Sequence, residues 1–363
     1  MRFVILILAF LIFKPSLGQG ESAIPESDSL SYKPRILGLP ILFYLPETRL
    51  GFGGAGFFSF KTNRNDTTLR PSQINLGAAY TLEKQILSYI DYDVWAANNK
   101  INLHGELGYY HFFYYFWGVG EEPRQQESFV VNFPRIRFEG YYEISDGLFL
   151  GPKYTYDFFD IVEREEGGRL IDNNYPGSDG GGISGIGLTS KYDTRDNNFY
   201  PTKGYNSILS YEYFSEAYGS DFNYHLIWAN FIKYFDLGED RVIGVNAYGR
   251  FSNGEVPFFH MSQVGGSNRM RGYYEGFHRD NHKIGWEVEY RTPLFWRFGL
   301  SLFAGNAVVA DKVSRFKTRN LNTAAGAGLR FKLDEERKIN LRLDFGVTSD
   351  RTTGFYFTIG EAF

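Results

Sequence analysis

Residues 264–294 read VGGSNRMRGYYEGFHRDNHKIGWEVEYRTPL, a loop rich in Gly, Asn and Arg followed by a strand that alternates apolar and charged residues. Successive side chains of a strand point to opposite faces. The two faces of this strand are Trp286, Val288 and Tyr290 on one side and Glu287, Glu289 and Arg291 on the other. An aromatic face opposite a charged face is typical of a membrane barrel wall, with lipid outside and a wet lumen inside.

The loop before this strand carries the tripeptide Arg271-Gly272-Tyr273. An arginine at this place has two interpretations, and the residues alone leave both open. It is either a solvated loop charge, or it folds back into the lumen against Glu287 or Glu289.

Composition and the N-terminal sequence favour an exported barrel. Aromatic residues make up 18% of the chain, which is high for a soluble domain, and no later stretch approaches the ~18 continuous apolar residues of a membrane helix. The first residues, MRFVILILAFLIFKPSLGQG, predict a signal peptide over residues 1–18. A short polar periplasmic tail (19–34) and a transmembrane β-barrel (35–363) follow. The alternative at this stage is a secreted soluble β-protein.

Alternating segments along the rest of the chain predict an all-β fold, a transmembrane antiparallel β-barrel of about 16 strands. The expected strands are 35–45, 49–61, 72–81, 84–95, 100–113, 128–143, 147–162, 182–192, 204–214, 220–235, 241–252, 282–292, 297–310, 321–332, 338–348 and 353–363. Bacterial barrels have long loops at one end and short turns at the other. The long connections 114–127, 163–181 and 253–281 all follow odd-numbered strands, as this rule requires.

The array in residues 264–294 resembles the outer-membrane insertase superfamily of the BamA/TamA/FhaC type, also called bacterial surface antigens. That family has a Gly-Gly turn, an Arg-Gly-(Phe/Tyr) loop tip and a strand reading Glu-x-Arg-x-Pro-Leu. The matching residues are Gly265, Gly266, Arg271, Gly272, Tyr273, Glu289, Arg291, Pro293 and Leu294. The stretch 185–204 resembles a further strand-turn-strand motif of the family, and the resemblance covers essentially the whole mature chain.

Two departures from the family pattern stand out. The family's periplasmic polypeptide-transport-associated domains need roughly 75 residues each, and the tail expected here is far below the size of a domain. The strand after the loop strand usually carries an Asp that meets the loop arginine, but SLFAGN (301–306) places Phe303 at that position. Glu287, Glu289 or Asp344 is expected to replace it, because a partly buried guanidinium needs an anionic partner.

No catalytic, cofactor or metal motif emerges from the sequence, so we expect no enzyme activity, no cofactor and no metal. The absence of cysteine excludes disulfides and thiol chemistry. His278, Asp280 and His282 stand at positions i, i+2 and i+4, which is compatible with a surface metal site, but a solvated loop is the simpler interpretation. A net charge of −4 gives no reason to expect a nucleic-acid partner.

The closing seam of the barrel is expected between the first and last strands. Pro40 lies inside the first strand and cannot donate to a ladder, and Phe363 ends the last strand as an outward terminal aromatic. In the resembled family this seam opens sideways, and a proline facing a short partner strand is the alternative explanation.

The resemblance implies assembly, insertion or translocation of proteins, or of lipids, at the outer membrane of a Gram-negative cell. Expected partners are outer-membrane lipid and glycolipid, together with client barrel proteins or a separate periplasmic or lipoprotein partner. The alternatives are a passive or plugged outer-membrane channel and a structural scaffold for surface lipoproteins.

Overall fold

The computed structural model describes residues 34–363 except 67, 121–124 and 336–337. The expected signal peptide (1–18) lies outside the described residues, as does the expected tail (19–34) apart from Pro34. Within the described part of the chain, no helix is long and apolar enough to cross a membrane.

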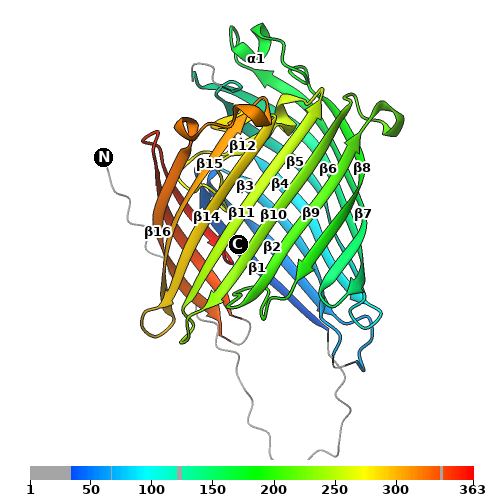
Figure 1. The fold of residues 1–363 in the computed structure, drawn as a ribbon, viewed down its shortest axis with the longest axis vertical. Coiled ribbons are helices and arrows are strands. Elements are labelled where there is room, and N and C mark those ends of the chain that lie inside the picture. The colour runs from blue at the N-terminus through cyan, green and yellow to red at the C-terminus, as the bar shows by residue number, and fades with distance from the viewer. Residues whose placement is uncertain (1–33, 67, 121–124, 336–337) are drawn as a thin grey trace, which may run out of the picture.

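Among the described residues, sixteen antiparallel strands form a closed barrel, which confirms the expected fold class and the expected strands to within a few residues (Figure 1). The strands are β1 (Arg35–Leu45), β2 (Arg49–Phe60), β3 (Ser72–Thr81), β4 (Ile86–Ala96), β5 (Ile101–Phe116), β6 (Glu127–Ser145), β7 (Leu148–Arg164), β8 (Gly181–Asp193), β9 (Gly204–Phe214), β10 (Tyr224–Asp236), β11 (Val242–Gly254), β14 (His282–Pro293), β15 (Phe298–Ala310), β16 (Asn322–Asp334), β17 (Ile339–Thr348) and β18 (Thr353–Ile359).

The remaining elements are short and lie in the connections. They are the hairpin of β12 (Ser262–Val264) and β13 (His278–Asp280), the helix α1 (Arg169–Asp172), and the 3-10 turns η1 (Glu216–Tyr218), η2 (Phe258–His260), η3 (Val313–Arg315) and η4 (Thr318–Asn320). We call the end of the barrel that carries the connections 117–126, 165–180 and 255–281 the loop end, and the opposite end the turn end. Two turn-end connections, 61–71 and 194–203, are longer than the simple rule for bacterial barrels predicts.

The wall of the barrel is higher on one side than on the other. β5, β6 and β7 have 16, 19 and 17 residues, whereas β1 to β4 have 10 to 12. The taller strands rise above the blue strands β1 to β4 in Figure 1. In the connections that follow β5 and β7, Trp117 packs against Tyr274, and Leu170 packs in one cluster with Phe258, both residues of the connection 255–281.

The expected alternation of faces is present in the wall. In β14, Glu287, Glu289 and Arg291 are buried on the inner face, and Trp286 is exposed on the outer face. Apolar residues exposed at mid-strand on the outer side include Phe231, Leu209 and Phe345. Such a surface is unfavourable in water and suits the hydrocarbon of a bilayer, because a closed barrel satisfies the backbone hydrogen bonds internally.

The expectation of a wet lumen is wrong for the loop end of the barrel. There, strands β5 to β10 contribute inward apolar side chains, most of them aromatic, that pack against Phe258 and Phe259 of η2 and Leu170 of α1. The rings of Phe159 and Phe259 stack with centroids 4.1 Å apart. The reason is visible in the run YYHFFYYFW (109–117), which is aromatic on both faces of β5 and so departs from strict alternation.

The barrel's outer face gives a first prediction. Replacing Phe231, which is exposed near the middle of β10, with arginine is expected to lower the free energy of unfolding by about 2–4 kcal/mol, because a charge is placed against lipid. Gln73→Arg is the control, since Gln73 lines a cavity of the lumen. Urea unfolding from phospholipid vesicles measures both variants, and equal losses would contradict the assignment of the two faces.

Candidate functional site: loop 6 anchored in the lumen

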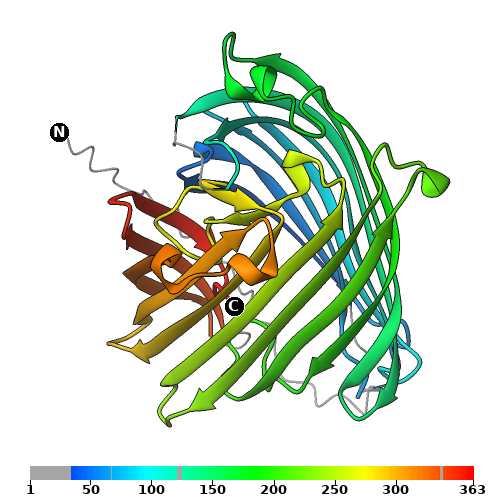
Figure 2. The ribbon, with the colours of Figure 1, turned by 45° about the horizontal axis from the view of Figure 1, so that its top comes forward.

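The sixth loop-end connection, residues 255–281 (loop 6), turns back into the barrel (Figure 2). The paired strands β12 and β13 form its stem. The tip between them carries the residues that the sequence singles out, Gly265, Gly266 and Arg271 to Tyr273. Gly265 and Gly266 both have a φ of +111°, a conformation that favours glycine. A Cβ on Gly265 would lie 2.3 Å from the Tyr274 carbonyl oxygen, so the turn requires the predicted Gly-Gly pair.

Arg271 at the loop tip is fully buried and bridges two carboxylates from different strands. Its Nη2 donates to Glu289 Oε2 of β14 at 2.5 Å, and its Nη1 donates to Asp344 Oδ2 of β17 at 2.6 Å. Burial works against the charge, but Glu289 and Asp344 outweigh it and hold the pKa of Arg271 above its ordinary value. The sequence leaves open whether Arg271 is a solvated loop charge or folds back into the lumen. In the structure it folds back into the lumen.

Phe303 of β15, which stands where the family pattern has an Asp, lies against the same guanidinium. The centre of the Arg271 guanidinium is 3.5 Å from the centroid of the Phe303 ring, a cation–π contact. The anionic role passes to Glu289 and Asp344, two of the three residues that the sequence offers. Glu287, the third, instead accepts the Met270 backbone N–H with Oε1 at 2.7 Å.

The backbone of the loop tip is held by contacts that sequence reasoning missed. The Tyr356 hydroxyl of β18 accepts the Gly272 N–H at 2.9 Å and donates to the Tyr273 carbonyl at 3.2 Å. The Tyr273 hydroxyl meets Ser349 Oγ at 3.0 Å. Gly272 comes so close to β17 that a Cβ would lie 2.9 Å from the Gly346 carbonyl carbon. The sequence feature that could have predicted these contacts is Tyr356, a hydrogen-bonding side chain on the inner face of the last strand.

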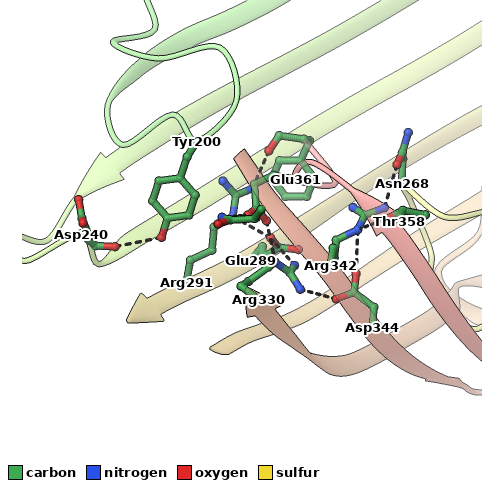
Figure 3. A network of polar contacts seen from close by, with 12 residues as sticks. Tyr200, Asp240, Asn268, Glu289, Arg291, Arg330, Arg342, Asp344, Thr358 and Glu361 are labelled. Atoms are coloured by element: carbon green, nitrogen blue, oxygen red, sulfur yellow. Dashed lines mark hydrogen bonds and ion pairs between the residues drawn. The ribbon is translucent and has the colours of Figure 1, made fainter. Parts of the chain in front are cut away.

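Glu289 and Asp344, the partners of Arg271, belong to a larger ionic network on the inner wall (Figure 3). Arg330 of β16 donates to Asp344 Oδ1 at 2.6 Å and to Glu361 Oε2 at 2.8 Å. Arg291 donates through Nε to Glu289 Oε1 at 2.8 Å, so it contacts a partner of the loop and does not touch the loop tip itself. The network therefore connects loop 6 with the last residues of the chain.

The last residues do not continue the final strand, which corrects the expectation of a strand over 353–363. β18 ends at Ile359, and Gly360 has a φ of +88°, so the chain turns into the lumen. Arg291 Nη2 donates to the Phe363 carbonyl oxygen at 2.5 Å. The Phe363 ring packs on the inner face beside Tyr200 and Tyr234, and it is not an outward terminal aromatic.

As a result, the seam between β1 and β18 is paired over a very short length. The register of the two strands comprises one Cα pair, Tyr44 with Phe357, whereas β1 and β2 are in register from Arg35 to Leu45. Continuing the seam register would place Pro40 opposite Glu361, but the Glu361 side chain is 2% exposed inside the ionic network. The N-terminal half of β1 thus has no strand partner on its seam side among the described residues.

Loop 6 also contacts the first loop-end turn, residues 46–48. The Glu275 N–H donates to Glu47 Oε1 at 3.0 Å, and Gln85 donates to the Glu47 carbonyl at 3.0 Å. Burial raises the pKa of Glu47 to about 7, and the neighbouring Glu275 carboxylate adds to this shift against the opposing backbone hydrogen bond.

The histidines considered as metal ligands are placed differently. His278 Nε2 lies 2.6 Å from Asp350 Oδ2, while His282 begins β14. The described residues contain no group of three or more His, Cys, Asp or Glu side chains that could hold a metal ion.

The chain belongs to the Omp85 superfamily, since the model of the Omp85 superfamily domain matches residues 168–363, more than half of its length. This confirms the resemblance that the motifs in residues 264–294 indicate. No curated protein matches the chain.

Solved structures share the fold at low sequence identity. BamA from Haemophilus ducreyi lacking POTRA domains 1–3 has a TM-score of 0.59 and 15% identity, covering 90% of this chain and 70% of that chain. CdiB from Acinetobacter baumannii has a TM-score of 0.55 and 11% identity, covering 90% of this chain and 59% of that chain. CdiB from Escherichia coli has a TM-score of 0.57 and 9% identity, covering 93% of this chain and 63% of that chain. The likeness extends over the barrel, and this chain spans less than two thirds of either CdiB chain.

The bridge made by Arg271 gives a second prediction. Arg271→Lys keeps the charge but removes the fork that reaches two carboxylates, so it is expected to lower the free energy of unfolding by about 2 kcal/mol and to expose loop 6 to protease. Arg315→Lys, in an exposed pair with Asp311, is the control and is expected to cost about 0.5 kcal/mol or less. Protease cleavage sites mapped by mass spectrometry report the loop, and an unchanged cleavage pattern would contradict the anchoring role.

The buried Glu47 gives a third prediction. Because its pKa is higher in the folded state than the ordinary 4.5, the folded barrel binds the extra proton between about pH 4.5 and 7. The free energy of unfolding therefore falls as pH rises through this window, by at most about 3 kcal/mol. Glu47→Gln is expected to flatten this dependence between pH 5 and 8, and Glu335→Gln, at an exposed position, is the control. Urea unfolding at pH 5 and pH 8 measures the change in the free energy of unfolding. If this change were the same in Glu47→Gln as in the wild type, the assignment to Glu47 would be wrong.

Proposed function

We propose that this protein inserts or translocates proteins at the bacterial outer membrane through the seam between β1 and β18, without catalysing a covalent reaction. The observation that carries the proposal is the single register pair at this seam, combined with the inward turn of residues 360–363. Among the described residues, the N-terminal half of β1 is therefore an unpaired strand edge in the wall of the barrel. Membership in the Omp85 superfamily supports protein insertion or translocation in general.

An unpaired strand edge at membrane depth has a physical consequence. Each backbone N–H and C=O without a partner is costly in hydrocarbon, and an incoming strand satisfies these groups by adding to the edge. Pro40 supplies no N–H, so this stretch of β1 offers fewer bonds to a permanent partner. The seam therefore favours exchange of partners over permanent closure.

A lumen cavity lies along the inner side of this region. It has a volume of about 1170 Å³ and is lined by inner-face residues of β2 to β5, including Gln73, Asn75 and Asp91, together with Ile359 and Gly360 beside the seam. A cavity next to an unpaired edge gives space for a strand that enters from the turn end. Client barrel proteins are the proposed cargo, and a periplasmic or lipoprotein component is the proposed partner.

A passive channel is the second candidate, because the fold is a closed barrel with charged residues on the inner wall. The filled loop end weighs against it, since loop 6 and the aromatic cluster around Phe258 occupy the lumen there. Ion flow would require both to move.

The seam provides the fourth prediction. The chain has no cysteine. The double variant Tyr44→Cys/Phe357→Cys places a disulfide across the one register pair, since paired Cα atoms of antiparallel strands lie within disulfide range. Leu341→Cys/Ile359→Cys joins β17 to β18 and leaves the seam free. In liposomes, the protein is expected to speed the folding of an unfolded client barrel, and only the oxidised seam variant is expected to lose this activity and regain it on reduction.

Each other outcome has a definite meaning. Equal activity of the oxidised and reduced seam variants would overturn the role of the seam. Steady conductance in planar bilayers, with no effect on any client, would favour the channel. Stoichiometric surface lipoproteins in a gentle purification, without either activity, would favour a scaffold.

A further inference from the structure

A second cavity of the lumen, separate from the Arg271 bridge, is lined by an excess of positive charge. It has a volume of about 450 Å³ and lies between loop 6 and the wall formed by β10, β11 and β14. Three cations line it from three different elements, Arg250 on β11, Arg269 in loop 6 and Lys283 on β14. The one carboxylate among its lining residues is Glu275.

Within the described part of the chain, none of these three cations has a carboxylate within 4 Å. Arg250 Nη1 donates to the His260 carbonyl and Lys283 Nζ to the Gln263 carbonyl, both at 2.5 Å. Arg269 Nη2 donates to Asn230 Oδ1 at 3.0 Å. All three hydrogen-bond partners are neutral, and the acids nearest to these cations, Glu212, Glu275 and Glu287, form no ion pair with them. This contrasts with the network around Glu289, where each cation meets an acid.

The cations are close to one another and partly unsatisfied. The Arg269 guanidinium and the Lys283 ammonium both lie over the Tyr248 ring, 5.1 and 5.6 Å from its centroid. The buried Nε of Arg269 has no hydrogen-bond partner. Like charges held together in a confined space repel one another, and a buried donor without a partner is costly. A bound anion would relieve both penalties.

The geometry points to an oxyanion-binding site, and we propose that this cavity binds a phosphate group between Arg250, Arg269 and Lys283. Arginine and lysine together provide the forked and single donors that phosphate oxygens accept. The volume exceeds that of the ion itself, so the site has room for a phosphate monoester as well as for free phosphate. This site goes beyond the proposed function, which uses the seam, and does not depend on it.

The test is binding of inorganic phosphate to the purified full-length protein in detergent, measured by calorimetry at constant ionic strength set with KCl. Arg250→Gln and Lys283→Gln are each expected to weaken binding at least about tenfold, the effect of losing one charged hydrogen bond. Glu275→Gln removes the carboxylate of the lining and is expected to strengthen binding several-fold. Because misfolding cannot strengthen binding, a higher phosphate affinity of Glu275→Gln is informative even if a cation variant folds poorly. Lys312→Gln, on the exposed connection 311–321, is the control for a change in net charge.

Glycerol 3-phosphate is titrated in parallel to distinguish the source of the phosphate. Tighter binding of the ester than of free phosphate identifies a headgroup-type ligand, and equal or weaker binding identifies the free ion. Absence of phosphate binding to the wild type, or an affinity that Arg250→Gln, Lys283→Gln and Glu275→Gln leave unchanged, would overturn the proposal.

Discussion

The buried bridge from Arg271 to Glu289 and Asp344 is the interaction on which the interior of this barrel depends. A guanidinium deprived of water is tolerable only when acids and other partners surround it, and the acids in turn need the cation. Removing loop 6 from the lumen would leave both carboxylates short of a partner. The loop and the inner wall of β14 to β17 therefore stabilise each other, which accounts for a long loop that folds inward.

The same acids extend this dependence to the end of the chain. Asp344 is shared between Arg271 and Arg330, and Arg330 also binds Glu361. The segment 360–363 is thus drawn into the lumen by charge, and it is no longer available to pair with β1. The weak seam follows from the ionic network, because residues that would lengthen β18 are used inside the barrel.

The sequence predicted the wall well and the interior only in part. Strand positions follow from alternation, a local property, and Glu289 was found because it lies on the strand directly after loop 6. Tyr356 was missed, since it meets the loop only after the barrel closes. The error at Phe363 has a local cause. In the sequence Phe363 continues the alternation of Phe355 and Phe357, but Gly360 ends the strand before it. The aromatic filling of the loop end was overlooked where β5 is apolar on both faces.

The interior is consequently divided into regions of different chemistry. Aromatic rings around Phe258 fill the loop end, and a neutralised set of arginines and acids lies along β14 to β18. Between them, Arg250, Arg269 and Lys283 face a cavity without matching acids. Water and ions reach such a cavity less freely than bulk solvent, so the excess charge is felt more strongly there. Arg291, Arg330 and Arg342 are each paired with an acid, whereas the three cations of this cavity leave an imbalance of charge at a site with room for an anion.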